Sequence, residues 1–255
     1  MGVEYDGTSY VGWQYQDNGK SVQAEVERAL SQVADESVRV VCAGRTDTGV
    51  HALGQVVHFD TNAERDERSW VFGTNANLPK DIAVLWARPV DDEFHARFSA
   101  RLRRYRYVIL NRPIRPTFLA FRVAWEYRPL NEDRMAAAAE FLLGEHDFSA
   151  YRAAGCQSKT PMRRIKSLDI ERKQDVIIID IVANAFLHHM VRNIAGVLMA
   201  IGAGEQAVDW TKTILETRDR TQAGITAPPH GLYLTDVDYS PDYDLPRLLH
   251  THMIW

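Results

Sequence analysis

The chain has 255 residues, of which 45% are hydrophobic, and a formal net charge of −4. This length and composition permit a large buried core in one domain or two, and the charge excludes a globally basic nucleic-acid coat protein. No apolar run approaches the roughly 18 residues of a membrane span, and the N-terminus lacks a signal-peptide pattern, so we expect a cytoplasmic protein with no membrane partner. The two cysteines share no metal-ligand spacing and suit a reducing compartment, so we expect neither a disulfide nor a zinc ion.

The first third of the chain has the element order of a βαββαβ unit. Ser21 is typical of a helix N-cap, and apolar residues recur after it with the spacing of one helix face. Runs of β-branched residues predict the strands. The predicted elements are a strand at Val3–Tyr5, a helix from Ser21, strands through Val41 and Val57, a helix over Glu67–Asn75 and a strand at Ile82–Trp86.

The same order recurs, with an insertion, in the rest of the chain. Asn131 is predicted to cap a helix whose first turn carries Glu132 and Asp133, which suit the positive end of the helix dipole. The predicted elements are a strand at Tyr105–Leu110, this helix with Met135, Ala139 and Leu142 facing inward, strands at Ile165–Arg172 and Val176–Asn184, helices at Leu187–Ile201 and Trp210–Leu215, and a strand at Gly231–Tyr239.

Each unit is therefore predicted to be ferredoxin-like, an open antiparallel sheet with both helices on one face. The fold class is α+β, with two such halves whose sheets lie side by side and an active-site cleft between them. We expect residues 1–90 to form the N-terminal half and residues 91–255 the C-terminal half. The Asp-rich segment Pro89–Glu93 is the predicted joint.

Two segments of this acidic chain are basic and free of acids. Phe94–Trp125 holds eight arginines, and Tyr151–Ser167 holds five lysines and arginines. A single run of this kind is usually a solvated face, but two runs interleaved with aromatic residues indicate a polyanion site with bases or sugars to stack. RNA is the ligand class that this pattern favours.

Residues 43–51 form a short polar turn between two β-branched stretches, and the chain is best suited to chemistry here. Gly44 and Gly49 bracket the turn and give its backbone the freedom to expose Arg45 and Asp47. An ordinary alternative is that Asp47 only caps its own turn. An aspartic protease needs two such carboxylates, and the chain has one Asp-Thr-Gly, so only a dimer could provide them. A phosphate-binding loop is excluded because no Gly-Lys-Ser/Thr follows the glycines.

Residues 44–51 read Gly-Arg-Thr-Asp-Thr-Gly-Val-His, and further blocks accompany them in order over nearly the whole chain. These blocks are Glu4–Gly7 with Gly12–Gln14, Asn75–Pro79, Phe94–Ala100, Arg104–Tyr107, His188–Asn193 and Gly231–Leu234. Together they resemble the tRNA pseudouridine synthase A (TruA) family, whose usual signature is Gly-Arg-Thr-Asp-Ala-Gly-Val-His. Thr48, in place of the usual Ala, adds a hydroxyl beside the acid.

The resemblance implies an isomerase that converts uridine to pseudouridine at positions 38 to 40 of the tRNA anticodon arm, as a homodimer, with no cofactor and no metal. It makes Asp47 the catalytic residue, because a carboxylate can add covalently at a sugar carbon or take a proton beside it. His188 and His189 follow one another on the predicted helix, so their side chains would point about 100° apart and could not bind one metal together.

The resemblance also assigns roles to four residues around Asp47. Arg192 would pair with the catalytic acid, since a buried carboxylate needs a partner. Tyr105 would stack on the flipped uracil, and Leu232 would close the pocket from the last strand. Arg45 would occupy the stack that the flipped nucleotide leaves.

Contacts with the RNA are expected from basic or flexible positions that match the family's blocks. The residues concerned are Arg65, Phe94, His95, Ala96, Arg97, Phe98, Arg101, Arg103, Gly155, Cys156, Gln157, Ser158 and Lys159. An alternative function, a tRNA-binding protein that clamps the anticodon arm without reacting, explains the basic segments but leaves the Asp47 turn without a purpose.

Overall fold

A computed structural model describes residues 1–17 and 19–246 of the chain. Its internal contacts separate two compact units. Among the described residues, unit 1 comprises Met1–Arg101 together with residues 233–246, and unit 2 comprises Leu102–Leu232. The division falls at Arg101 rather than near residue 90, and residues 233–246 return to the first unit. No helix of the described residues has both the length and the apolar character that crossing a membrane requires.

The sheet of unit 1 has the strand order expected of a ferredoxin-like unit. Strand β1 (Gly2–Tyr5) lies between β3 (His51–His58) and β4 (Ile82–Trp86) and is antiparallel to both. The short β2 (Val41–Cys42) pairs with the far side of β3 in the antiparallel sense. Strand β10 (Leu232–Asp238) pairs with β3 in parallel, so the last strand of the chain extends the sheet of the first unit.

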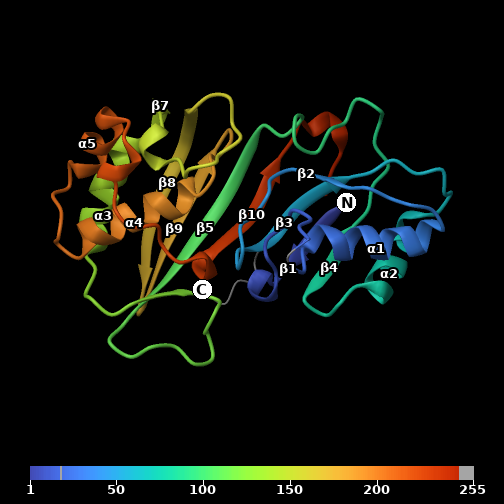
Figure 1. Cartoon of the computed structure of the whole chain (residues 1–255), viewed down its shortest axis with the longest axis horizontal. Coiled ribbons are helices and arrows are strands. Elements are labelled where there is room, and N and C mark those ends of the chain that lie inside the picture. Colours follow the sequence, from blue (N-terminus) through green and yellow to red (C-terminus); the bar gives the residue numbers. More distant parts are fainter. Residues whose placement is uncertain (18, 247–255) are drawn as a thin grey trace. The chain divides into compact units, whose positions relative to one another are not determined.

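Two helices pack against each other in unit 1 (Figure 1). Helix α1 (Val22–Ala34) begins where predicted, because the Ser21 hydroxyl accepts a hydrogen bond from the Ala24 N–H at 3.3 Å. Helix α2 (Glu67–Asn77) is capped in the same way by Asp66, which accepts from Ser69 at 2.6 Å. The apolar stripe of α1 is buried, which confirms the periodicity of its sequence.

The sheet of unit 2 is a series of antiparallel strands. Its order is β5 (Leu102–Asn111), β9 (Val176–Ala183), β8 (Met162–Lys173) and β7 (Gly144–Asp147). The short β6 (Ala124–Glu126) runs parallel to the end of β5. Strands β7 and β6 were not predicted, and both are short edge strands with little periodicity of their own.

Three helices pack together in unit 2 (Figure 1). Helix α3 (Glu132–Ala139) is capped by Asn131, whose side chain accepts from the Arg134 N–H at 2.8 Å, as predicted. Helices α4 (Met190–Gly202) and α5 (Trp210–Thr217) follow, and almost every residue of α4 is buried. Helix α4 begins three residues later than expected, because His189 adopts a left-handed conformation with φ of 60°.

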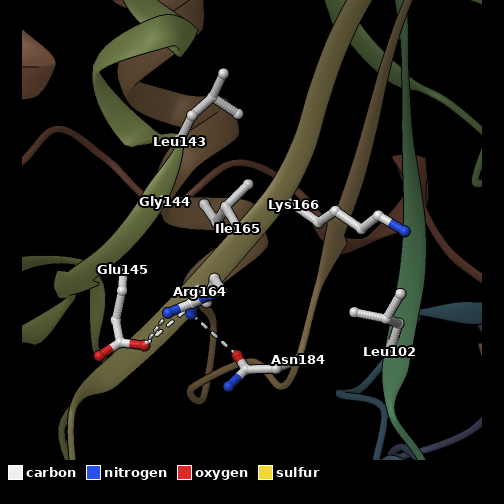
Figure 2. A pocket seen from close by; sticks show the side chains of 8 residues that line it. All are labelled: Leu102, Leu143, Gly144, Glu145, Arg164, Ile165, Lys166 and Asn184. Carbon is white, nitrogen blue, oxygen red and sulfur yellow. Dashed lines mark hydrogen bonds and ion pairs between the residues drawn. The ribbon is translucent and has the colours of Figure 1, made fainter.

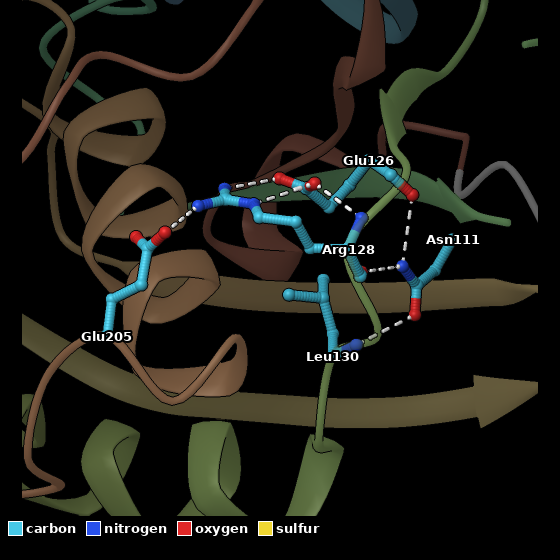
Figure 3. A network of polar contacts seen from close by, with 5 residues as sticks. All are labelled: Asn111, Glu126, Arg128, Leu130 and Glu205. Atoms are coloured by element: carbon cyan, nitrogen blue, oxygen red, sulfur yellow. Dashed lines mark hydrogen bonds and ion pairs between the residues drawn. The ribbon is translucent and has the colours of Figure 1, made fainter. Parts of the chain in front are cut away.

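A polar network connects β5, β6 and the start of α3 (Figure 3). The amide of Asn111 donates to the backbone carbonyls of Glu126 at 3.0 Å and Arg128 at 2.6 Å, and its oxygen accepts from the Leu130 N–H at 3.1 Å. The Arg128 guanidinium bonds the buried Glu126 carboxylate at 2.6 and 3.0 Å and also pairs with Glu205. Side chains thus supply the hydrogen bonds that this irregular connection cannot make within a sheet.

Candidate active site

The Asp47 turn is held along one side by the backbone of residues 10–13. The Trp13 N–H donates to the Thr46 carbonyl at 3.0 Å, and Gly12 forms an antiparallel bridge with Asp47. The Thr48 hydroxyl donates to the Val11 carbonyl at 3.0 Å. The hydroxyl by which this chain departs from the usual signature therefore adds a contact that ties the turn to its neighbour.

Glycine is required where these two segments approach. Gly12 has φ of +109°, and a Cβ built there would lie 2.7 Å from the Thr46 carbonyl oxygen. A Cβ on Gly7 would lie 2.0 Å from the Val50 carbonyl oxygen. Gly49 has φ of 76°, as its expected freedom requires. Side chains at Gly12 and Gly7 would push the Asp47 turn away from its support.

A buried polar layer lies beneath the turn. The fully buried Gln55 amide donates to the Gly44 carbonyl at 2.6 Å and accepts from the Gly44 N–H at 3.3 Å. The Tyr5 hydroxyl lies 3.5 Å from the same amide and 2.7 Å from the Thr46 hydroxyl. Sequence reasoning missed this layer, although a single glutamine among the apolar residues of β3 was a signal for it. The layer fixes the start of the turn at Gly44, three residues before Asp47.

His51 at the end of the motif joins a second buried contact. Its ring stacks on Tyr233 with centroids 4.7 Å apart and planes at 22°. Its Nδ1 accepts from the Gly7 N–H at 3.1 Å and lies 3.2 Å from an Asp6 oxygen. The hydrogen bond from Gly7 and the stacking on Tyr233 hold the ring at this corner of unit 1.

The two charged side chains of the turn differ in exposure. Asp47 is half-buried and Arg45 is exposed. A half-buried carboxylate is partly shielded from bulk water, whereas an exposed guanidinium is accessible to solvent. The roles that the motif suggests for these two residues stay predictions.

Tyr105 lies on β5, paired with Ile181 of β9, and only 7% of its surface is exposed. The Phe186 ring meets it edge-on, with centroids 5.0 Å apart and planes at 85°. Phe186 was not predicted from the sequence, because nothing local marks a phenylalanine after a strand as the support of a distant tyrosine. The contact orients the tyrosine ring.

Arg192 lies in the first turn of α4 and is anchored there. Its Nε donates to the Ala227 carbonyl at 2.9 Å, and the Ala227 N–H donates to the Arg192 carbonyl at 3.1 Å. The next residue, Asn193, is fully buried and accepts from Arg220 at 3.0 Å and from Thr226 at 2.7 Å. These contacts tie the start of α4 to the segment that leads to Leu232, which is itself buried.

The expected RNA contacts differ in accessibility. Seven of these residues are exposed: Arg65, Arg97, Phe98, Arg101, Gly155, Gln157 and Lys159. Three are half-buried: His95, Cys156 and Ser158. Phe94, Ala96 and Arg103 are buried, which corrects the expectation for their side chains. The Phe94 ring packs on Tyr239 with centroids 5.2 Å apart, and the Arg103 guanidinium donates to the Asn184 carbonyl at 2.8 Å.

In the segment Phe94–Phe98, buried contacts hold the backbone so that the side chains of Arg97 and Phe98 stay exposed. Burial and the neighbouring His95 lower the pKa of His58, so its neutral Nδ1 accepts from the Ala96 N–H at 3.1 Å. The His95 Nδ1 accepts from the backbone N–H groups of Arg97 and Phe98 at 3.2 Å each. The Phe98 ring stacks on His95 yet stays 75% exposed. The turn therefore offers a cation and an aromatic face to solvent.

Two arginines of the second basic segment point inward. Arg152 donates to the carbonyls of Cys156 at 2.5 Å and Ser158 at 3.0 Å, and the buried Arg163 donates to the Ser158 hydroxyl at 2.5 Å. Burial alone would raise the pKa of Cys156, but hydrogen bonds from the His188 and Ser158 N–H groups, together with Arg152, lower it overall. These arginines shape the loop that the sequence predicted as an RNA contact.

His188 and His189 precede α4 instead of lying within it. Their rings are tilted by 43° with centroids 4.0 Å apart. The prediction that helix geometry points them about 100° apart is therefore wrong, because neither residue is helical. The expectation of no metal then depends on the family resemblance alone.

Comparison with known proteins identifies the family of the chain. A model of the family described as tRNA pseudouridine synthase matches residues 1–99 and 138–240. A tRNA pseudouridine synthase A from Shewanella amazonensis is 57% identical over 248 residues, which cover 97% of this chain and 95% of the relative. Proteins of the same name from Nitrosococcus oceani and Pseudomonas aeruginosa are each 56% identical and cover the whole chain, with 98% and 90% of the relative aligned. The chain belongs to the tRNA pseudouridine synthase family.

Proposed function

We propose that this protein isomerises uridine to pseudouridine in tRNA, at positions 38 to 40 of the anticodon stem-loop. Membership of the family supports the reaction and the substrate class. The observation that carries the proposal within the chain is the Asp47 turn, which is braced by backbone contacts on one side and by buried side chains beneath. Such bracing holds one carboxylate in place, as catalysis by a positioned group requires.

In the proposed reaction the bond between N1 of the uracil and C1′ of the ribose breaks, and a bond between C5 and C1′ forms. Asp47 acts as nucleophile at the sugar or as base beside it, and both roles need the ionised carboxylate. The C5 proton leaves and N1 gains a proton, so the product is an isomer of the substrate. No redox step or external reactant is required.

Four other residues are proposed to hold the nucleotide or to balance the negative charge of Asp47. Arg192 is the counter-ion of Asp47, and the anchoring of its Nε on Ala227 supports a fixed orientation of the guanidinium. Tyr105 stacks on the uracil, supported by its edge-on contact with Phe186. Leu232 closes the pocket, and the exposed Arg45 fills the gap in the stack after base flipping.

We propose that the enzyme acts in the cytoplasm as a homodimer. Cys42 and Cys156 form no disulfide, which suits a reducing compartment. Unit 2 carries large apolar side chains that are exposed in a single chain, which is typical of a protein interface. They belong to the loop after β5, to β6 and to the residue that follows β6: Ile114, Phe118, Phe121, Trp125 and Tyr127.

Release of tritium from tRNA labelled at C5 of uridine tests the activity, because only bond formation at C5 expels that hydrogen. The wild-type chain should release it, and Asp47→Asn should release none while binding tRNA within about three-fold of the wild type, since the amide is nearly isosteric but neither nucleophilic nor basic. A wild-type chain that binds tRNA without release would favour the alternative, a clamp for the anticodon arm. Release by a sequence-verified Asp47→Asn variant would refute the role of Asp47.

A further inference from the structure

In unit 2 the segment 220–228 lies directly on helix α4. Gly196 of α4 has no side chain where the segment crosses it, and a Cβ built there would lie 1.9 Å from the Ile225 carbonyl oxygen. The backbone of the segment therefore contacts the helix itself. The Ile225 side chain is 79% exposed, so its burial does not hold the segment in place. Polar contacts do so instead.

Three side chains form a closed triangle of hydrogen bonds between the segment and α4. Asn193 of α4 is fully buried, and its oxygen accepts from the Arg220 guanidinium at 3.0 Å and from the Thr226 hydroxyl at 2.7 Å. Arg220 also donates to the Thr226 hydroxyl oxygen at 2.9 Å and to the carbonyls of Ala223 at 3.2 Å and Gly224 at 3.0 Å. Such a network holds one geometry, because losing one member leaves the others with unsatisfied polar groups.

The triangle adjoins the residue that anchors Arg192. The Arg192 Nε donates to the Ala227 carbonyl at 2.9 Å, and the Ala227 N–H donates to the Arg192 carbonyl at 3.1 Å. Ala227 is buried and follows Thr226 directly, so the triangle fixes the position of this carbonyl. A shift of Thr226 would move the carbonyl and would turn the guanidinium with it, because Nε is part of the rigid planar group.

Arg192 is also close to the face of the unit 2 sheet that carries Tyr105. Tyr105 and Tyr107 are two residues apart on β5, so their side chains point to the same face. The Tyr107 hydroxyl donates to the Pro228 carbonyl at 2.8 Å. Burial raises the pKa of Tyr107, and the charge of Arg192 acts on the same hydroxyl in the opposite sense. The anchored guanidinium therefore lies on the side of the sheet where the uracil is proposed to stack.

We propose that the triangle of Asn193, Arg220 and Thr226 positions Arg192 for the reaction. It holds the Ala227 carbonyl, and this carbonyl orients the guanidinium. The inference rests on the proposed function, because the reaction gives Arg192 its role. Catalysis by oriented groups is sensitive to small displacements, since a misplacement of about 1 Å can cost about a hundred-fold in rate. We therefore expect the triangle to affect the rate of the reaction and not the affinity for tRNA.

Thr226→Val tests this proposal, because valine has nearly the shape of threonine but can neither donate to Asn193 nor accept from Arg220. It should lower the rate of tritium release at saturating tRNA by about ten-fold to a hundred-fold and leave the Kd for tRNA within about two-fold. Thr226→Ser keeps the hydroxyl and should keep the rate within about three-fold. Denaturant unfolding of the same samples gives the folded fraction by which each rate is corrected.

A double-mutant cycle shows whether the effect passes through Arg192. Arg192→Lys keeps a positive charge but lacks the guanidinium Nε that bonds the Ala227 carbonyl. Thr226→Val should therefore lower the rate by less than about two-fold in the Arg192→Lys chain. An equal loss in both backgrounds would show that the triangle acts on some other group, and the proposal would be wrong.

Asn193→Ala and Asn184→Ala form a matched pair. The side-chain oxygen of Asn184 also accepts two hydrogen bonds, from the N–H groups of Arg164 at 3.0 Å and of the residue after Asn184 at 2.9 Å. Asn184 and Leu102 line a hollow of about 570 Å³ (Figure 2). Leu102 lies three residues from Tyr105 on β5 and points to the opposite face of the sheet. Asn184→Ala should therefore lower stability and keep the corrected rate, whereas Asn193→Ala should lower both.

Failure of this inference can be told apart from failure of the proposed function. A wild-type chain that releases no tritium would refute the isomerase itself. Tritium release by the wild type with an unchanged corrected rate in Thr226→Val would refute the positioning role alone and leave the triangle as a structural contact. A loss of tRNA affinity in Thr226→Val without a loss of rate would assign the segment to RNA binding and would equally overturn the proposal.

Discussion

Tyr105 is the residue proposed to stack on the uracil. Its ring is held at one edge by Phe186 while 7% of its surface stays accessible. If the ring and not the hydroxyl holds the uracil, Tyr105→Phe should keep most of the activity. Tyr105→Leu should lose about ten-fold to a hundred-fold, because stacking of one base on an aromatic ring contributes about 1–3 kcal/mol. Rates of tritium release at saturating tRNA measure the difference.

A substitution at the neighbouring Tyr107 is the control for a loss of activity that comes only from destabilising β5. The fully buried Tyr107 hydroxyl donates to the Pro228 carbonyl at 2.8 Å, so Tyr107→Phe should lower the stability of unit 2 more than the reaction rate. Equal losses of activity in Tyr105→Phe and Tyr105→Leu would indicate that the hydroxyl, and not the ring, is what the reaction uses.

The Asp47 turn depends on its contact with residues 10–13, and Gly12 is where that contact is tightest. Gly12→Ala should abolish most of the activity and lower the free energy of unfolding by about 1–3 kcal/mol, because the new Cβ meets the Thr46 carbonyl in a strained backbone conformation. Denaturant unfolding and tritium release measure the two effects on the same samples.

Gly204 is the matched control, with φ of +78° and no atom within 4 Å of an added Cβ. Gly204→Ala should therefore carry only the backbone cost, about 1 kcal/mol, and keep its activity. An active Gly12→Ala enzyme would show that the turn does not need this support.

The polar network between β5, β6 and α3 makes the free energy of unfolding depend on pH. Burial by itself would raise the pKa of Glu126, but its bonds with the guanidinium and the backbone N–H of Arg128 outweigh burial and lower the pKa from its ordinary 4.5. The folded carboxyl thus stays ionised to a lower pH than the unfolded one. Its contribution to stability is present above about pH 4.5 and is lost as the pH falls through the folded pKa.

Glu126→Gln should lower the free energy of unfolding by about 2 kcal/mol at pH 7 and by less at pH 3, where the wild type has lost the same interaction. Denaturant unfolding at several pH values measures this. Glu216→Gln removes an exposed carboxylate 3.9 Å from Lys212 and should change little at any pH. If Glu126→Gln lowered the free energy of unfolding by the same amount at pH 3 and at pH 7, the charge of Glu126 would not be what stabilises the fold.

For the whole molecule, the exposed apolar side chains of unit 2 predict self-association. The wild type should have a mass of about twice the 29.0 kDa of one chain in sedimentation equilibrium. Phe118→Asp, at a side chain that is 84% exposed, should shift the mass toward one chain, because a buried unpaired charge opposes the interface. Phe72→Asp places the same charge on an exposed phenylalanine of α2 and should leave the dimer intact. A monomeric wild type would refute the homodimer, and a dimeric Phe118→Asp would move the interface elsewhere.

Much of this protein could be predicted from local chemistry. Ser21 and Asn131 cap helices because a side-chain oxygen at that position satisfies a free N–H whatever the rest of the fold does. The strand at Ile82–Trp86 and the α+β class follow from residue type and periodicity, which act over a few positions. The Asp47 motif and the family are readable for the same reason, since each of the blocks that carry them is a short run of adjacent residues.

What could not be predicted depends on contacts between distant residues. The pairing of β10 with β3, the inward turn of Arg103 and Arg163, and the bond of Gln55 to Gly44 are each decided by partners that the local pattern does not specify. An arginine looks the same in the sequence whether it meets a carbonyl of its own chain or a phosphate. Burial separates the two cases, because a buried polar group must find its hydrogen bonds inside the protein, and burial exists only once the chain has packed.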